Sequence, residues 1–106
     1  MRFGLSKRDQ GYILEALSKF PEIEKAIIFG SRAMGNNEKG SDVDVAVVGK
    51  NVTHTTMVRL RSLFNEELPL PYFFDVVHYE KTNNENLKRH IDQEGKDLLP
   101  KRVSEL

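Results

Sequence analysis

The stretch from Gly30 to Asp44, GSRAMGNNEKGSDVD, decides how this sequence is interpreted. It separates two apolar runs, KAIIF at residues 25–29 and DVDVAVV at residues 42–48. Short runs that are rich in β-branched and aromatic residues, each followed by glycine, predict two buried strands. Between the strands we expect one helical turn and then a surface loop, because residues 35–40 are polar and rich in glycine.

Two aspartates, Asp42 and Asp44, lie at the start of the second of these strands. Side chains two residues apart on a strand point to the same face, with their α-carbons about 6–7 Å apart. Carboxylates held so close repel each other, and Mg²⁺ relieves this repulsion because it prefers oxygen ligands. Two such ions roughly 4 Å apart can hold the attacking and leaving oxygens of a displacement at phosphorus. Asp42 and Asp44 are therefore predicted as catalytic residues and as ligands of two Mg²⁺ ions.

Gly30 and Ser31 are predicted to bind the phosphates of a nucleotide. Glycine lets the backbone approach a phosphate without a Cβ in the way. If Ser31 begins a helical turn over residues 31–34, its hydroxyl and the free N–H groups of the turn face that phosphate. Arg32 could contact a triphosphate through two hydrogen bonds, or it could form a structural salt bridge.

Asp75 is the third predicted carboxylate, and it lies within the apolar run YFFDVVHY at residues 72–79. A carboxylate in the middle of an apolar strand is costly to bury without a partner. On the face shared with Asp42 and Asp44, it would complete a three-carboxylate site and hold the second metal ion. It could also accept the proton of an attacking hydroxyl. The alternative is a solvent-facing acid on an edge strand.

Apolar residues at helical and strand spacing predict the remaining elements. Strands and helices alternate, which predicts the α/β (α+β) class, with a small mixed β-sheet and helices packed on it. We expect one domain over residues 1–106. Its further elements are expected as helices at residues 7–20, 55–68 and 85–94, a strand at residues 72–79 and a short edge strand at residues 97–99.

The composition excludes several classes of function. The 106 residues include 16 basic and 16 acidic side chains, a formal net charge of zero that gives no sign of bulk attraction to nucleic acid or to an anionic membrane. Without cysteine, disulfides, zinc-thiolate sites and thiol catalysis are excluded. No apolar run approaches the roughly 20 residues that cross a bilayer, and the N-terminus lacks the apolar stretch of a secretory signal. We therefore expect a cytoplasmic protein.

Other residues that could carry chemistry have ordinary interpretations. The histidines lack metal-ligand spacing, and we expect unremarkable surface or strand positions for His54, His78 and His90. An aromatic run is expected in the core, although one of its rings could stack on a base; it comprises Tyr72, Phe73 and Phe74. The pattern GxxxxGK[ST] is absent, so the chain is not a P-loop NTPase.

Gly-Ser, ten residues, Asp-x-Asp and a later strand aspartate together resemble the motif of the DNA polymerase beta-type nucleotidyltransferases. With GSRA near its start and a last helix that ends in EG, the chain is similar to the minimal nucleotidyltransferases, the MNT family. The resemblance implies Mg²⁺-dependent transfer of a nucleoside monophosphate, AMP from ATP, with Asp42, Asp44 and Asp75 as the three carboxylates. It also implies an antitoxin partnered with a helical HEPN toxin encoded nearby, which it adenylylates on a tyrosine.

Three functions stay open at this point. The chain could be an enzyme that transfers a nucleotide to a hydroxyl acceptor, with a partner supplying the specificity. It could be a regulatory subunit of a two-protein complex that binds nucleotide and metal without turnover. It could also neutralise a toxin by contact alone, in which case replacing Asp42 and Asp44 with asparagine would leave protection intact.

Overall fold

The computed structural model describes residues 3–38 and 40–99; Lys39, within the expected surface loop, and the ends of the expected 1–106 domain lie outside them. The elements follow the predicted alternation of helices and strands. They are α1 (Lys7–Ser18), β1 (Lys25–Phe29), α2 (Ser31–Met34), β2 (Val43–Val48), α3 (His54–Ser62), a π-helical turn (Leu63–Glu67), β3 (Phe74–His78), a 3-10 turn (Tyr79–Lys81), α4 (Glu85–Glu94) and β4 (Lys96–Asp97).

The four strands form one mixed sheet in the order β3-β2-β1-β4. β1 pairs antiparallel with β2 and with β4, whereas β2 and β3 are parallel. This confirms the predicted small mixed sheet with helices packed on it. Because β2 and β3 are parallel, their N-terminal ends lie at the same end of the sheet, next to the C-terminal end of β1. The residues predicted as functional lie at that end.

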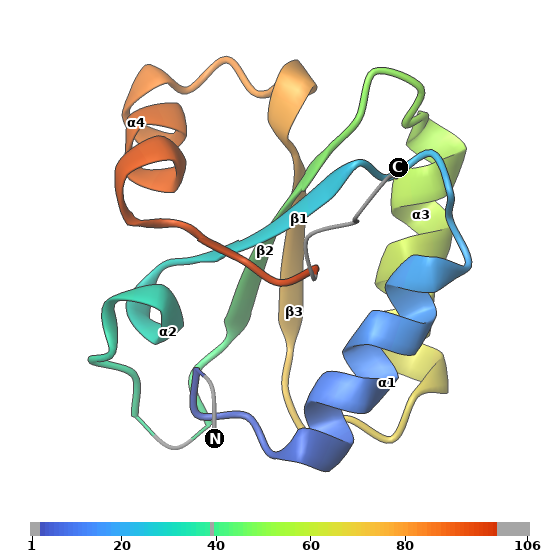
Figure 1. The fold of residues 1–106 in the computed structure, drawn as a ribbon, viewed down its shortest axis with the longest axis vertical. Coiled ribbons are helices and arrows are strands. Elements are labelled where there is room, and N and C mark those ends of the chain that lie inside the picture. The colour runs from blue at the N-terminus through green and yellow to red at the C-terminus, as the bar shows by residue number, and fades with distance from the viewer. Residues whose placement is uncertain (1–2, 39, 100–106) are drawn as a thin grey trace, which may run out of the picture.

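Each face of the sheet has its own apolar cluster, because neighbouring side chains on a strand point to opposite faces. Valines 43, 45 and 47 of β2 point to the face covered by α1 and α3, where most of the core lies. On the other face, Phe29, Ala46 and Ile91 form a smaller cluster with α4. Figure 1 shows α1 and α3 on one side of the sheet and α4 on the other. Asp42 and Asp44 alternate with the valines, and so they belong to the α4 face.

Side-chain caps set the starts of the long helices. Ser6 accepts a hydrogen bond from the N–H of Asp9, as its place in the S-x-x-D pattern predicts. Thr53 and Thr56 form a reciprocal capping box at the start of α3. The expected helix over residues 55–68 is wrong in its second half: α3 ends at Ser62, and a π-helical turn follows it. The first helix ends at Ser18, two residues earlier than expected.

The third strand is shorter than its apolar run, and the 3-10 turn begins at Tyr79, directly after it. The expected strand covered residues 72–79, but β3 covers only Phe74–His78. Phe74 forms hydrogen bonds through both its N–H and its carbonyl with the side-chain amide of Asn65, 2.8 and 3.0 Å long. Arg61 donates to the carbonyl of Val76. These side chains occupy part of the outer edge of the sheet, where another strand would otherwise pair.

Glycine is needed at position 95, the end of α4, because of close packing and not because of a left-handed backbone conformation. The residue has an extended backbone, with φ −67° and ψ 150°, rather than the left-handed conformation of many C-cap glycines. A Cβ built there would collide with the side chain of Ile27 and with the carbonyl of Ile91. Glycine therefore lets the chain turn tightly from α4 into β4 against β1. The edge strand was expected at residues 97–99, and it is found at Lys96–Asp97.

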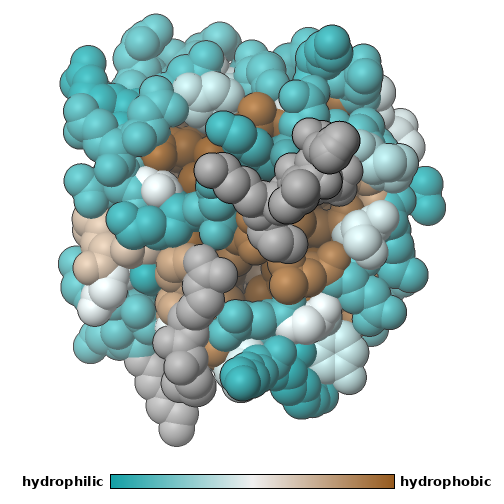
Figure 2. Space-filling view, in the orientation of Figure 1, coloured by the Kyte–Doolittle hydropathy of each residue, from teal (hydrophilic) through white to brown (hydrophobic). Residues whose placement is uncertain are grey.

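Hydrophobic side chains reach the surface in the middle of the face seen in Figure 2, where the sheet lies between α1 and α4, and hydrophilic side chains surround them. In the part of the chain that the structure describes, no helix is long and apolar enough to span a bilayer.

Candidate active site

The three predicted carboxylates lie at one end of the sheet and on one face. In the parallel pairing of β2 with β3, Asp44 and Asp75 are direct partners. Side chains of paired residues on neighbouring strands point to the same face, about 4.5–5.5 Å apart at Cβ. Asp42 lies two residues before Asp44 and shares its face. The structure therefore brings together the acids that the sequence places in two separate segments.

Gly30 follows β1 directly and lies against the carboxylate of Asp44. A Cβ built on Gly30 would collide with Asp44 Oδ2, and the glycine has a φ of +74°. Both facts require glycine, because a positive φ strains other residues and the collision leaves no space for a side chain. The turn into α2 therefore places the backbone of Gly30 beside Asp44.

The electrostatics of the site follow from this crowding. The pKa of Asp44 is raised by burial and by the negative charges of Asp75 and Asp42. Arg32 and, when protonated, His90 act in the opposite direction. Asp42 and Asp75 are exposed to solvent, and Asp44 is half-buried. The site is thus a cluster of like charges open to water on one side, an arrangement that favours the approach of a cation.

The guanidinium of Arg32 is already engaged by other groups and is not free to bind a phosphate at the acids. Its side chain is buried, only 3% exposed. The guanidinium donates from Nη1 to the carbonyl of Phe3 at 2.9 Å, and from Nη2 and Nε to the carbonyl of Ser41 at 2.7 and 3.2 Å. It also lies over the ring of Tyr72, 4.8 Å from the centroid. Direct contact with a triphosphate stays a prediction, and it would require the guanidinium to leave these carbonyls. In the described part of the chain, the structural role of Arg32 is to donate to these carbonyls and not to form the salt bridge that was the alternative.

His90 is a residue of this site that the sequence does not reveal. The expectation of an unremarkable surface or strand histidine is wrong for it: His90 lies on α4, and its Nε2 accepts a hydrogen bond from the N–H of Gly30, 2.9 Å long. Its ring also packs edge-on against Phe29, with centroids 5.9 Å apart. A separation of 60 residues between His90 and Gly30 leaves no local pattern from which this contact could be recognised.

The acids fit a magnesium ion chemically, though they do not form a complete cage. Among residues 3–38 and 40–99, no three histidine, aspartate or glutamate side chains come close enough to hold a metal ion by themselves. Mg²⁺ usually takes one or two carboxylates and completes its shell with water and substrate phosphate. Oxygen donors on one face, with one carboxylate whose pKa is raised by like charge, match that requirement.

The aromatic run before Asp75 divides between the core and the surface. Phe74 is buried and stacks on Phe64, with ring centroids 4.5 Å apart. Tyr72 is half-buried and donates from its hydroxyl to Asp9. Phe73 was expected in the core, which is wrong: its side chain is 60% exposed. Phe73 directly precedes β3, two residues before Asp75, and its carbonyl accepts a hydrogen bond from the N–H of Val43.

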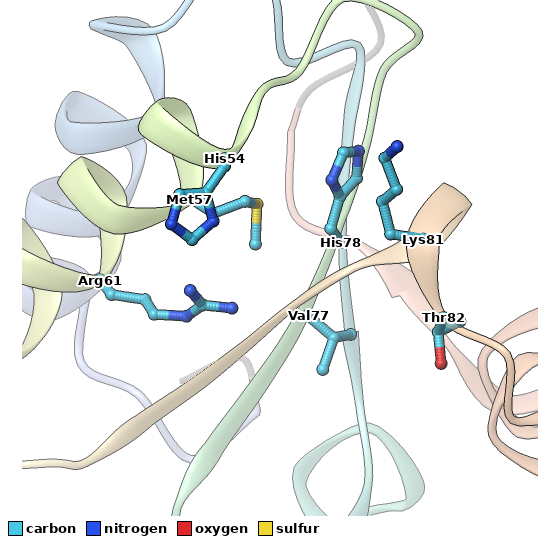
Figure 3. A pocket seen from close by; sticks show the side chains of 7 residues that line it. All are labelled: His54, Met57, Arg61, Val77, His78, Lys81 and Thr82. Atoms are coloured by element: carbon cyan, nitrogen blue, oxygen red, sulfur yellow. The ribbon is translucent and has the colours of Figure 1, made fainter.

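A separate pocket of about 460 Å³ lies at the opposite end of β3 (Figure 3). It contains no carboxylate, and its lining is basic and apolar, formed by His54, Met57, Arg61, Val77, His78, Lys81 and Thr82. Two of its basic side chains already have partners: Arg61 donates to a strand carbonyl, and His78 lies 3.5 Å from the carboxylate of Glu80. This pocket is therefore separate from the predicted nucleotide site.

Several solved structures share this fold. A toxin-antitoxin crystal structure with AMP-PNP aligns at a TM-score of 0.71 and 21% identity, over 89% of this chain and 75% of that chain. The toxin-antitoxin MntA-HepT gives 0.65 and 20%, over 89% and 72%. A complex of a tri-AMPylated Shewanella oneidensis HEPN toxin with an MNT antitoxin gives 0.62 and 20%, over 85% and 68%. At these identities the likeness shows the fold. Among curated proteins, none matches.

A match to a family model assigns the chain to a protein family. The model of the family described as "Polymerase beta, Nucleotidyltransferase" matches residues 12–102. That range is most of the chain, and it includes the glycine-serine turn and all three aspartates of the site. The chain therefore belongs to the polymerase beta nucleotidyltransferase family.

Proposed function

We propose that this nucleotidyltransferase transfers AMP from ATP to a hydroxyl group of a partner protein, in a reaction that depends on Mg²⁺. The observation that carries the proposal is the position of Asp44, which pairs with Asp75 across two parallel strands and lies against Gly30. Acids for cations and a backbone turn for phosphate thus meet at one point. Such a site would hold a triphosphate through its metal ions at the acids and through its phosphates at the turn. The solvent-exposed side of the acids is left open to an acceptor.

In this proposal the acids divide into two roles. Asp42 and Asp44 would hold Mg²⁺, and Asp75, on the neighbouring strand β3, would hold the second ion and face the acceptor. When bound, Mg²⁺ neutralises the charge that develops on the phosphate oxygens. Asp75 accepts the proton as the hydroxyl oxygen forms a bond to the α-phosphorus. The bond from that phosphorus to the bridging oxygen breaks, and pyrophosphate leaves.

The glycine-serine turn would hold the triphosphate. Gly30 is the N-cap of α2 and provides no side-chain cap, so the N–H groups at the start of the turn are not taken by a capping side chain. The hydroxyl of Ser31 adds a donor beside them. Arg32 supports the site by holding the carbonyl of Ser41, the residue next to Asp42. Ordering this loop helps to fix the first of the acids.

The proposed acceptor is a tyrosine of a helical HEPN-type toxin, which would make this chain an antitoxin. Structures of the same fold include toxin-antitoxin complexes, one of them with a tri-AMPylated HEPN toxin and an MNT antitoxin, which supports this choice. Phe73 supports it as well, since an exposed aromatic side chain beside Asp75 is suited to contact a partner or a nucleotide base.

The direct experiment incubates the chain with its genomic neighbour, Mg²⁺ and ATP labelled at the α-phosphorus. Label on the neighbour, lost on replacement of a tyrosine with phenylalanine, is the expected result. Label that appears for wild type and disappears for Asp44→Asn and Asp75→Asn, with folding retained, assigns the reaction to this site. Absence of label with tight Mg-ATP binding would favour the regulatory subunit, and protection of cells by the Asp42→Asn, Asp44→Asn double variant would favour neutralisation by contact.

The role of Phe73 has a matched control on the same chain. Phe73→Ser is expected to reduce label transfer with little change in unfolding temperature, since the ring is already in water. Val58 is also exposed, at 48%, and it lies on α3, which packs on the face of the sheet opposite the acids. Val58→Ser should leave transfer unchanged. Equal effects of both substitutions would show that Phe73 has no special contact.

A further inference from the structure

We propose that His90 is a positioning residue for nucleotide binding, because it fixes the peptide group that leads into the Gly30-Ser31 turn. The inference rests on the proposed function, since it concerns how the same site holds its nucleotide. His90 reaches this site from α4, a helix that contributes no other polar contact to Gly30 among the described residues. Its Nε2 accepts the N–H of Gly30 at 2.9 Å.

One contact of the imidazole ring and two contacts of α4 set the position of His90. Ile91, the next residue of α4, is buried in the cluster with Phe29 and Ala46. The edge of the His90 ring contacts Phe29 at an interplanar angle of 78°. At the end of the helix, Gly95 lets the chain pass close to Ile27. These contacts seat α4 on β1 and direct Nε2 at the start of the turn.

The hydrogen bond also assigns the protonation form of the ring. An imidazole nitrogen that accepts an N–H carries a lone pair, so the proton of this neutral ring is on Nδ1. The N–H of Gly30 is thereby turned toward α4 and is not available to a phosphate. Donation to the nucleotide is left to the backbone of the following residues and to the hydroxyl of Ser31.

Gly30 needs such a restraint more than another residue would. Its φ of +74° lies in a region that glycine enters freely, and glycine has the largest choice of alternative backbone conformations. The carboxylate of Asp44 blocks one side of its α-carbon. His90 holds the other side through the amide. Without this acceptor the peptide can rotate, and the N–H groups that follow would no longer be presented together to a phosphate.

The test compares three substitutions at position 90 with a control histidine. His90→Phe keeps a ring against Phe29 and removes the acceptor, whereas His90→Gln replaces Nε2 with an amide oxygen at similar reach. His54 is exposed and lies at the opposite end of the fold, which makes His54→Phe the matched control. His90→Leu removes both the ring and the acceptor. Calorimetry with ATP and Mg²⁺ measures affinity, and thermal unfolding measures whether each variant is folded.

We expect His90→Phe and His90→Leu to weaken Mg-ATP binding by about three- to tenfold, the effect of one lost hydrogen bond. His90→Gln should restore most of the affinity, and His54→Phe should leave it unchanged. A purely structural role predicts lower unfolding temperatures without rescue by glutamine. Equal affinity of wild type and His90→Phe would overturn the positioning role.

A nuclear magnetic resonance measurement separates this inference from the proposed function. Long-range nitrogen-15 correlation spectra of the histidine side chains should show Nε2 of His90 without a proton, and the Gly30 amide should shift in His90→Phe. A protonated Nε2 in the wild-type protein would overturn the inference even if Mg-ATP binds. Failure of wild type to bind Mg-ATP, with the expected spectra, would instead overturn the proposed function and the site role of His90 with it.

Discussion

The carboxylate of Asp44 lies against the α-carbon of Gly30, in the place that a Cβ would occupy. This relationship joins the two halves of the predicted motif, which are separated by a turn and a loop in the sequence. It also explains why this chain needs glycine at position 30. A carboxylate that holds a cation and a backbone that receives a phosphate must come within a few ångströms of each other.

The first prediction concerns the conflict between stability and function at Asp44. Its pKa in the folded protein is raised by burial and by Asp75 and Asp42, so the folded state favours the neutral acid. That stabilisation is present below the unfolded pKa and is lost as pH rises, and at pH 7 the ionised group reduces stability. Asp44→Asn should therefore raise the free energy of unfolding by a few tenths to about 1 kcal/mol in metal-free buffer.

The same substitution should reduce label transfer by roughly 10²–10⁴-fold. Thermal unfolding in EDTA and the transfer assay measure the two effects on the same preparation. Added Mg²⁺ should stabilise the wild type more than the variant. A variant that is less stable than wild type without metal would contradict the account of charge repulsion at this site.

Two glycines of this chain should respond in opposite ways to alanine. Gly30→Ala introduces a collision with Asp44 at a φ of +74° and should cost about 1–3 kcal/mol of stability. Gly11 lies within α1, and a Cβ there would meet no atom within 4 Å. Gly11→Ala should therefore stabilise the protein by roughly 0.5–1 kcal/mol. Urea unfolding of both variants checks this, and a neutral Gly30→Ala would show that the turn is not restricted as described.

Much of the fold could be predicted, because its signals are local. The bounds of β1, α2 and α4 match the expected residues, since a glycine lies at or next to an end of each. The helix after β2 was expected too long, because its apolar spacing continues through a π-helical turn that has no separate sequence signature. β3 is shorter than its apolar run, because the chain enters a 3-10 turn at Tyr79, and apolar composition alone does not mark that change.

The site residues likewise divide into those that local sequence signals predict and those that depend on tertiary contacts. Motif spacing predicts Asp42, Asp44 and the Gly30 turn, and strand alternation then predicts which face they share. The pairing of Asp44 with Asp75 depends on strand order and register, which periodicity does not determine. The contacts of Arg32 and His90 depend on segments far away in the chain, and so their partners could not be recognised from the sequence.

Arg32 should matter more to folding than an exposed cation would. Arg32→Met removes the hydrogen bonds that the guanidinium donates to the carbonyls of Phe3 and Ser41, and each hydrogen bond to a charged group contributes about 1.5–3 kcal/mol. We expect a loss of roughly 2–4 kcal/mol on that basis. Arg32→Lys should also lower the free energy of unfolding, because a single ammonium cannot replace the planar guanidinium.

Urea unfolding provides the measurement, with the exposed Arg89→Met on α4 as the control. Unchanged stability of Arg32→Met together with weaker Mg-ATP binding would show that Arg32 acts mainly on the nucleotide. That result would restore the direct phosphate contact as its main role.

Glu22 provides a prediction on pH. Its pKa is lowered, chiefly by the hydrogen bond that Thr56 donates to it at 2.6 Å. The resulting stability is present above the unfolded value, about 4.3, and is lost as pH falls through the lower folded pKa. Glu22→Gln should therefore be less stable than wild type at pH 7, by a few tenths to about 1 kcal/mol. The difference should shrink as pH falls below the unfolded value and vanish once pH lies below the lowered folded pKa. A difference that is as large at pH 3 as at pH 7, or one shared by the exposed Glu15→Gln, would contradict this explanation.

The most direct measurement is a crystal structure of the protein with Mn²⁺ and a non-hydrolysable ATP analogue, since Mn²⁺ replaces Mg²⁺ on oxygen ligands and can be located by anomalous scattering. The account predicts an anomalous peak in contact with Asp42 and Asp44, and the triphosphate on the Gly30-Ser31 turn with the α-phosphate facing Asp75. Manganese bound away from these aspartates at saturating nucleotide, or a triphosphate held elsewhere on the fold, would contradict it.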